Sequence, residues 1–444
     1  MAATIKKPAR RIAFGYAEAT EAPRAPLQPD WLATLRAEAR VLIAEGLPSP
    51  RVEAWKYTNL LPLAERRFAV VGDAPRDVAP GALARADLGR SAYRLVFVNG
   101  RFEPALSELG ALPKGAALVS LADALVADPA ALAGKIGRSG AVRNHVLAAY
   151  STAFFADGAL IRLDAGVVLD RPVHLVFIGA AGASSLAFHP RLIVEAGAGS
   201  QLTLVESHIG EAGAYWANPV SEIAVGEGAL VRHAKLQDET MAAHHLALVD
   251  VSVAKNGRYE STVLALGAAL SRHEIVVRLE GEYAEARLDG GYLIGGKQHC
   301  DNTTLIEHLV PRGTCREVYK GVLDGESRGA FQGTIIVHKG AVKTDANQLS
   351  RALMLSKGAE ADAKPELEIY ADDVKCSHGA SAGALDPVQM FYLRSRGIDE
   401  DAARALLVEG FIGETIEGIA DEAVRGYFAG RIARWLAGHA VGER

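Results

Sequence analysis

The spacing of apolar side chains divides the chain into parts with different periods. From Asp30, which we take as a helix N-cap, to Gly46 the apolar positions follow the period of an amphipathic helix. These positions are Trp31, Leu35, Leu42 and Ile43. Helical patterns continue to about residue 154, broken by a strand pattern at residues 93–100. We therefore predict a mixed, mostly helical N-terminal domain over residues 30–154, after a loosely ordered leader over residues 1–29.

From residue 155 to residue 385 the pattern changes to short β-rich runs separated by turns that contain glycine. Gly199, Gly228 and Gly257 each precede a new run and are spaced 29 residues apart, and Gly281 follows 24 residues later. Self-similarity of this kind is typical of a solenoid, and with strands as the repeated unit it favours a parallel β-helix. A β-sandwich is the structural alternative, since it also has short strands and regular turns. A solenoid has open ends that must be capped or paired, which is a first indication of a partner.

After residue 385 the helical period returns. Asp386 can cap a helix whose first residue is Pro387, and two further helices are expected before the chain ends. Three short helices make a core too small to be stable alone. We therefore expect the C-terminal domain, residues 386–444, to pack on the β region or on another protein.

Composition excludes several classes of partner. Apolar residues make up 49% of the 444 residues, as in an ordinary globular protein, and the net charge is -5. A chain without a basic field is not expected to bind nucleic acid or an anionic membrane surface. No apolar run approaches the ~18 residues of a membrane span, and no secretory signal is recognisable. Three cysteines form no disulfide framework, so the cytoplasm is the expected location.

Familiar catalytic motifs are missing from the sequence, and we predict no catalytic residue. There is no phosphate-binding Gly-x-x-x-x-Gly-Lys-Ser/Thr loop, no Gly-x-Ser-x-Gly elbow and no His-Glu-x-x-His pair. The glycine-rich run Gly290–Gly296 is expected to form turns. The adjacent pairs His244-His245 and His299-Cys300 would point to opposite faces of a strand, so we expect neither pair to share a metal ion.

One pair has a spacing that suits a shared site. Cys376 and His378 lie two residues apart in a run that reads as a strand, so their side chains are expected on one face. A thiol and an imidazole are ligands that soft and borderline metals prefer. Two ligands do not close a site, because zinc would take four. The alternatives are a buried thiol beside a hydrogen-bonded histidine, or a metal site completed by ligands from elsewhere, such as another chain.

The run Glu368–Gly383, followed by Gln389–Gly397, resembles the SufD branch of the SufB/SufD family of the SUF iron–sulfur cluster assembly system. The resemblance covers the whole chain and is strongest from about residue 320 to residue 400. Further matching segments are Pro50–Asn59, Lys343–Asp345, Leu353–Ser356 and Asp362–Leu367. The SufB branch shares the fold but is expected to carry additional cysteines and to lack the Lys-Cys-Ser-His-Gly-Ala run, so three cysteines favour the SufD branch.

The resemblance implies a right-handed parallel β-helix core, residues 155–385, between the two helical domains. It also implies a scaffold subunit rather than an enzyme, which pairs with SufB while two copies of the ATPase SufC bind the helices after Asp386. His378 is implied as a ligand at the SufB interface, where a nascent iron–sulfur cluster or iron would be held transiently, with Cys376 as the weaker candidate. A flavin on the complex and a homodimer formed when SufB is missing are further expectations from the family.

Two other functions are compatible with a β-helix. Many parallel β-helices are polysaccharide lyases or hydrolases, but no paired-carboxylate site stands out on the repeat here. A structural solenoid with an inert Cys-x-His pair is the other alternative. The sequence assigns no role to the polar and aromatic segment Arg51–Asn59.

Overall fold

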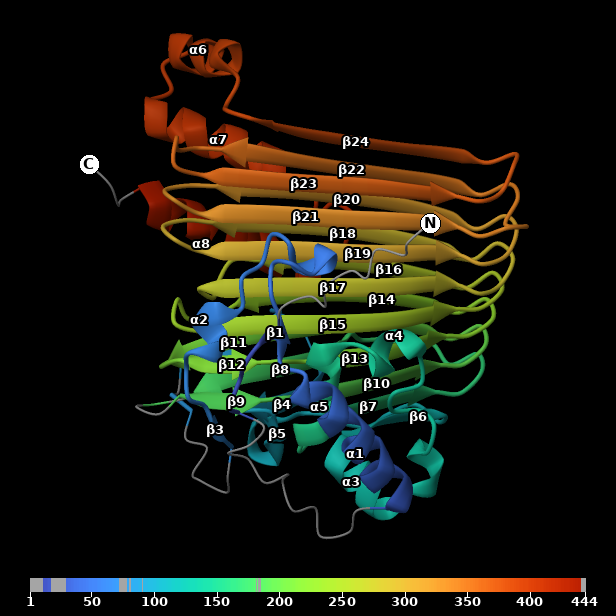
Figure 1. The fold of residues 1–444 in the computed structure, drawn as a ribbon. Coiled ribbons are helices and arrows are strands. Elements are labelled where there is room, and N and C mark those ends of the chain that lie inside the picture. The colour runs from blue at the N-terminus through green and yellow to red at the C-terminus, as the bar shows by residue number, and fades with distance from the viewer. Residues whose placement is uncertain are drawn as a thin grey trace, which may run out of the picture.

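The computed structural model describes residues 11–16, 29–71, 78–79, 81–89, 91–180, 182 and 185–440. Successive strands alternate between two long, mostly parallel sheets that stack turn upon turn (Figure 1). The chain forms a β-solenoid of about eight turns with helices at both ends, so the predicted parallel β-helix is confirmed over the sandwich alternative.

We call one sheet the front sheet, since its strands lie toward the viewer in Figure 1. Its strands, from the N-terminal end of the solenoid, are β6 (Ala116–Ser120), β7 (Gly158–Leu163), β10 (Arg191–Ala196), β13 (Val220–Val225), β15 (His244–Val253), β17 (Leu270–Leu279), β19 (His299–His308), β21 (Arg328–Val337) and β23 (Glu360–Ile369). Three short strands join this sheet at one side, namely β3 (Ala69–Val70), β9 (Leu186–Phe188) and β12 (Tyr215–Ala217).

The other sheet is the back sheet. Its strands are β5 (Arg101–Phe102), β4 (Tyr93–Val98), β8 (Val173–Ala180), β11 (Gln201–Ala212), β14 (Leu230–Asp238), β16 (Arg258–Ala265), β18 (Glu285–Ile294), β20 (Thr314–Leu323), β22 (Asp345–Met354) and β24 (Lys375–Gly383). Alternate residues of both sheets point inward and form one continuous core, to which Leu204, Val231 and Tyr259 contribute from the back sheet.

The repeated turns explain the spacing of the glycines. Gly199 and Gly228 follow β10 and β13 at equivalent positions, and both have positive φ angles, of 66° and 63°. On the next turn, the residue in register with Gly228 is Asn256, with a φ of 54°, and not Gly257 as expected. Asparagine tolerates the left-handed conformation better than most residues, so the backbone repeat continues without a glycine.

The N-terminal region does not end at a sharp boundary. Its helical segments are α1 (Asp30–Ala44), α2 (Leu61–Ala64), α3 (Leu121–Ala127), α4 (Gly140–Arg143), α5 (Val146–Phe154) and the 3-10 turns η1 (Glu53–Trp55), η2 (Leu83–Ala86), η3 (Pro104–Leu106) and η4 (Ala130–Leu132). However, β4 pairs in parallel with β8, and β6 pairs antiparallel with β7, so two strands from this region belong to the solenoid sheets. The region closes the N-terminal end of the solenoid.

Two details of the N-terminal region differ from expectation. The N-cap of α1 is Pro29, and Asp30 is the first helical residue, with no side-chain cap, although the helix ends before Gly46 as predicted. Most of the expected leader lies outside the described residues. The described residues 11–16 of the leader are packed rather than loose. β1 (Arg11–Ile12) pairs with β2 (Leu47–Pro48), and Phe14 and Tyr16 are buried against aromatic rings of the solenoid flank.

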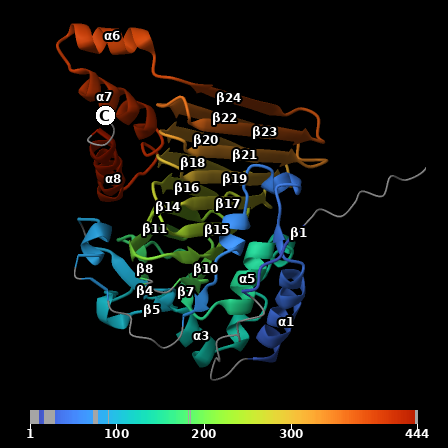
Figure 2. The same ribbon diagram turned by 60° about the vertical axis from the view of Figure 1, so that its left-hand side comes forward.

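The C-terminal helices are α6 (Pro387–Ser395), α7 (Glu400–Gly413) and α8 (Glu422–Ala440). Asp386 caps α6 by accepting a hydrogen bond from the backbone N–H of Val388, as predicted. Helices α7 and α8 bury apolar side chains against the back sheet, whereas α6 projects beyond the last strands (Figure 2). In the part of the chain that the structure describes, no helix is long and apolar enough to cross a membrane.

Candidate functional site

The C-terminal end of the solenoid presents two edge strands. Among the described residues, β24 pairs only with β22 in the back sheet, and β23 pairs only with β21 in the front sheet. Each strand therefore has one edge of backbone N–H and C=O groups without a sheet partner. Ile369 and Tyr370, at the end of β23, are 43% and 61% exposed. This end combines unpaired backbone with exposed apolar side chains, which are features of a surface that pairs with another chain.

Cys376 and His378 lie on β24 at this open end. They are in register with Ala346 and Gln348 of β22, which are buried in the interior, so both side chains start from the inward face. Cys376 is half-buried and packs against the core, while His378 is exposed. The predicted strand and shared face are confirmed, and the role of the pair as ligands stays a prediction.

The environment of the thiol favours the histidine as the better ligand. Burial and then the nearby Asp345 carboxylate raise the pKa of Cys376 above its ordinary value, which disfavours the thiolate that binds metals. In the described residues no three His, Cys, Asp or Glu side chains are arranged to hold a metal ion. A ligand set built on Cys376 and His378 would therefore need donors from outside the described chain.

A second thiol–imidazole pair lies deeper in the interior, two strands away from Cys376. Cys315 of β20 is buried, with its Sγ 3.2 Å from Nε2 of His308 on β19. Burial raises the pKa of the Cys315 thiol above its ordinary value, and it lowers the pKa of the His308 imidazole to about 4. Both groups are therefore neutral at physiological pH, and the pair is an inert part of the core.

The interior also contains a polar cluster that sequence reasoning missed. Glu206 of β11 is fully buried, with its carboxylate 2.8 Å from Nε2 of His208 and 2.9 Å from Nε2 of His233. Burial alone would raise the pKa of Glu206, but these hydrogen bonds and the nearby Lys235 hold it well below its ordinary value. Burial lowers the pKa of Lys235, against the attraction of Glu206 and Glu239. The cluster is a buried, internally compensated set of charges.

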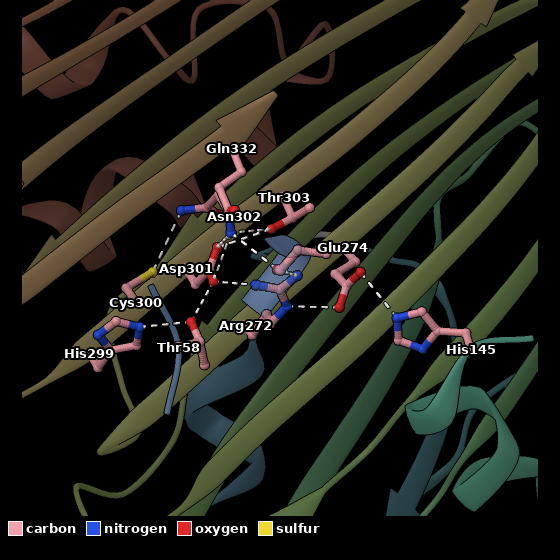
Figure 3. A network of polar contacts seen from close by, with 11 residues as sticks. Thr58, His145, Arg272, Glu274, His299, Cys300, Asp301, Asn302, Thr303 and Gln332 are labelled. Carbon is pink, nitrogen blue, oxygen red and sulfur yellow. Dashed lines mark hydrogen bonds and ion pairs between the residues drawn. The ribbon is translucent and has the colours of Figure 1, made fainter. Parts of the chain in front are cut away.

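The segment without an assigned role forms a network on the outer face of the front sheet (Figure 3). Arg272 of β17 is buried, pairs with Asp301 and with Glu274 at 2.7 Å, and donates to the backbone carbonyl of Ala54 at 2.9 Å. The ring of Trp55 covers the guanidinium at 4.1 Å. The segment therefore docks on the solenoid through one buried cation.

The same network contains a hydroxyl, an imidazole and a carboxylate, as a nucleophilic triad does, but their contacts follow a different order. The Thr58 hydroxyl donates to the Asp301 carboxylate and lies 3.0 Å from Nε2 of His299 (Figure 3). In a nucleophilic triad the carboxylate orients the imidazole, which activates the hydroxyl. Here the carboxylate accepts from the hydroxyl directly, so the group does not have the order of contacts of that triad. The signal that could have revealed this network is the pair of charged residues at equivalent outward positions on successive turns, Arg272 and Asp301.

The other histidine and glycine predictions have separate outcomes. His244 and His245 point to opposite faces of β15, and both are buried; His245 Nδ1 lies 2.8 Å from Glu239. His299 faces Thr58, while Cys300 contacts Asn302 in the interior. The prediction of turns throughout Gly290–Gly296 was wrong, since Gly290 lies inside β18. The residue there is glycine because a Cβ would lie only 2.1 Å from the ring of Tyr319.

A second exposed surface lies on the C-terminal helices. Val388, Phe391 and Tyr392 of α6 are 72%, 74% and 56% exposed. A hollow between α6 and α7 is lined by Leu385, Pro387, Met390, Phe391, Arg394, Ser395, Glu400 and Arg404. Exposed aromatic and aliphatic side chains on a projecting helix are typical of a protein docking surface.

Comparisons with known proteins cover nearly the whole chain. Residues 21–175 match the model of the SufBD protein N-terminal region, and residues 177–411 match that of the SUF system FeS cluster assembly, SufBD core domain. The chain is 32% identical to the iron–sulfur cluster assembly protein SufD of Escherichia coli K12 over 404 residues, which cover 90% of this chain and 92% of the relative. It is 32% identical to a SufBD family protein of Synechocystis over 86% of this chain and 85% of the relative. Identity to SufD of Bacillus subtilis is 28%, over 90% of this chain and 92% of the relative.

Proposed function

The chain belongs to the SufB/SufD family of the SUF iron–sulfur cluster assembly system, and we propose from this premise that it is a scaffold subunit. In this role it pairs with a SufB-type chain through the open end of its β-helix and binds a SufC-type ATPase through its C-terminal helices. The nascent cluster is cargo that is built at the junction and then handed on. The single observation that carries the proposal is the exposed His378 on β24, a strand with one free edge.

The open end supports pairing with a chain of the same fold. A second β-helix can continue either sheet by hydrogen bonding to the free edge of β23 or β24. Pairing would also cover Ile369 and Tyr370. A paralogue whose own edge strand carries a thiolate would bring that ligand beside His378, and would add a donor to a site that the described residues do not complete.

His378 suits a transient cluster better than a permanent one. A neutral imidazole can replace cysteine as a ligand to iron in iron–sulfur centres. A site shared between two chains is complete only while the chains are in register, so a movement at the junction can expose or dismantle it. We propose that ATP binding brings two SufC-type subunits together and that the C-terminal helices transmit this movement to the junction.

The attachment of these helices to the solenoid supports such a transmission. Lys320 of β20 is buried and bonds the backbone carbonyl of Phe411 at 3.0 Å and the carboxylate of Glu414 at 2.5 Å. Arg431 of α8 pairs with Asp238 at the end of β14. Helix α6 lies between β24, which ends at Gly383, and α7, so a force on α6 would reach the back sheet through both elements.

No other function is favoured by a specific observation. The Thr58–His299–Asp301 group lacks the contact order of a hydrolytic triad, and family membership argues against the polysaccharide lyase and hydrolase alternative. We propose that ATP hydrolysis belongs to the SufC-type partner and that assembly takes place in the reducing cytoplasm, where the unpaired cysteines of this chain stay reduced.

The test is an anaerobic co-expression of this chain with the SufB and SufC proteins of the same organism. We would purify on a tag carried by this chain and measure subunits, iron, acid-labile sulfide and flavin absorbance. His378→Ala is the test variant. Ser377→Ala is the matched control, because Ser377 lies on the opposite face of β24, where its hydroxyl donates to Asn347 at 2.6 Å.

We expect the wild type and Ser377→Ala to carry iron and sulfide in a complex with both partners, and His378→Ala to keep the partners but lose the cluster. A folded chain that captures neither partner would contradict the proposed assembly. A normal cluster in the His378→Ala complex would contradict the role of the histidine and leave the assembly intact.

A further inference from the structure

Three polar residues line up in the interior and end at the open edge. Glu317 of β20, Gln348 of β22 and His378 of β24 occupy equivalent positions on three neighbouring strands. All three start from the inward face of the back sheet. Glu317 and Gln348 are 1% and 3% exposed, whereas His378 is exposed because no further turn covers it. The line thus leads from a buried carboxyl to the imidazole at the proposed junction.

The first two members of the line are joined. Nε2 of Gln348 donates a hydrogen bond of 2.7 Å to Oε2 of Glu317. The Glu317 oxygen accepts this hydrogen bond, so the amide nitrogen faces Glu317 and the carbonyl oxygen faces away from it. Room for this amide comes from Gly333 across the interior, where a Cβ would lie 2.1 Å from Nε2 of Gln348. The Gln348 side chain is therefore confined between Glu317 and the backbone at Gly333.

The carbonyl oxygen of Gln348 is an unsatisfied hydrogen-bond acceptor in the part of the chain that the structure describes. Within the described residues, Oε1 of Gln348 is buried and has no hydrogen-bond partner. A buried acceptor without a partner costs free energy, and such groups in native proteins call for an explanation. Side chains in this register can reach across the two strands, since the neighbouring pair Ser377 and Asn347 is hydrogen-bonded at 2.6 Å. The residue in register with Gln348 on the next strand is His378.

We propose that Gln348, held by Glu317, positions His378 by accepting a hydrogen bond from one nitrogen of its imidazole. This inference rests on the proposed function, in which His378 binds iron of the nascent cluster. The hydrogen bond keeps the proton on the nitrogen that faces Gln348 and leaves the other nitrogen unprotonated and directed toward the junction. Partners of this kind orient metal-binding histidines and fix their tautomer.

The direct test is the tautomer of His378 in the full-length chain, which needs neither iron nor a partner. Histidine labelled with ¹⁵N distinguishes the two neutral tautomers by the chemical shifts of the ring nitrogens, and His378→Ala identifies the signal. We expect one dominant tautomer in the wild type. Gln348→Met keeps the volume but removes the acceptor, so the minor tautomer should rise several-fold. Asn347→Ala, on the opposite face of β22, is the matched control and should leave the tautomers unchanged.

A second measurement separates this inference from the proposed function. In the anaerobic complex, loss of a partner that orients a metal-bound histidine is expected to weaken iron binding about 10-fold or more. A tautomer change in Gln348→Met without loss of iron would support the positioning and overturn its importance for iron binding, while the ligand role of His378 is tested by His378→Ala. If Gln348→Met does not fold, Gln348→Asn retracts the same oxygen and serves instead. Unchanged tautomers in a folded variant would overturn the inference, whatever the iron content.

Discussion

Arg272 and Asp301 occupy equivalent positions on β17 and β19 and form a fully buried ion pair on the outer face of the front sheet. Trp55, from a segment more than 200 residues earlier in the chain, covers the pair with its ring (4.1 Å from the guanidinium carbon). Gln332 of β21 donates to the same backbone carbonyl of Ala54 at 3.4 Å. The segment thereby ties three successive turns of the solenoid to the N-terminal region.

Removing the cation should therefore destabilise the chain strongly. In Arg272→Met the carboxylates of Asp301 and Glu274 lose their buried partner, and a broken buried ion pair typically costs about 3–5 kcal/mol. We expect a lower thermal midpoint and faster proteolysis near Trp55. Arg258→Met is the matched control: Arg258 pairs with Glu285 at 2.7 Å, but both side chains are nearly half exposed, so the cost should stay below about 1 kcal/mol. Equal losses in the two variants would contradict this role of the network.

The ionisation of Glu317 should set a pH dependence. Burial raises the pKa of Glu317 to about 7 in the folded chain, against the opposing hydrogen bond from Gln348. The folded state thus binds this proton more tightly than the unfolded state, whose ordinary value is 4.5. The stabilising contribution of the protonated carboxyl is complete below pH 4.5 and is lost as the pH rises through about 7.

Glu317→Gln keeps the volume and removes the charge, so it should escape this loss. We expect the variant to match the wild type near pH 4.5 and to be more stable by about 3 kcal/mol at pH 9, as measured by thermal denaturation across that range. Glu326→Gln, at a side chain that is 70% exposed, should show no such difference. A constant gap between Glu317→Gln and wild type at every pH would show that Glu317 does not titrate in this range.

The sequence was sufficient to predict the solenoid because its period is local. Most strands alternate residues that face the interior with residues that face outward, and Gly199 and Gly228 mark equivalent bends. The pair Cys376 and His378 could be found for the same reason, since a two-residue spacing on a strand needs no tertiary information. What the pattern did not contain was the position of α6 or the end at which the solenoid stays open.

The polar interior was missed for a physical reason. Lys235 and His233 follow strand alternation, and polar residues at alternate positions normally indicate a face toward solvent. They point inward here, and their burial is offset by Glu206 on the neighbouring strand. The docking of Thr58 on Asp301 joins residues 243 positions apart, so no local pattern could predict it.

The anchor between the C-terminal helices and the back sheet should respond to the loss of Lys320. This side chain is 1% exposed and gives α7 a charged bond to Glu414 and a bond to the carbonyl of Phe411. Hydrogen bonds to charged groups contribute about 1.5–3 kcal/mol, so Lys320→Met should make the amides of α7 exchange faster with deuterium. Lys297→Met, at a side chain 87% exposed, should change nothing. Unchanged exchange in α7 would place the attachment in the apolar contacts alone.

The exposed face of α6 should be needed for binding and not for folding. Phe391 is 74% exposed, so Phe391→Ser should leave stability within about 0.5 kcal/mol of the wild type. If α6 is the docking helix for the SufC-type partner, a central aromatic there should contribute about 2 kcal/mol or more, which is roughly a 30-fold loss of affinity.

We would measure this loss by calorimetry with the purified ATPase and measure SufB binding in parallel. The SufB-type chain should bind unchanged, because the proposed pairing uses the free edges of β23 and β24 and not the exposed side chains of α6. Val126→Ser, on α3 at the other end of the molecule and 61% exposed, is the matched control. Undiminished ATPase binding by Phe391→Ser would move the docking surface from α6 to α7 or α8. Loss of both partners together would instead mean that α6 contributes to the junction itself.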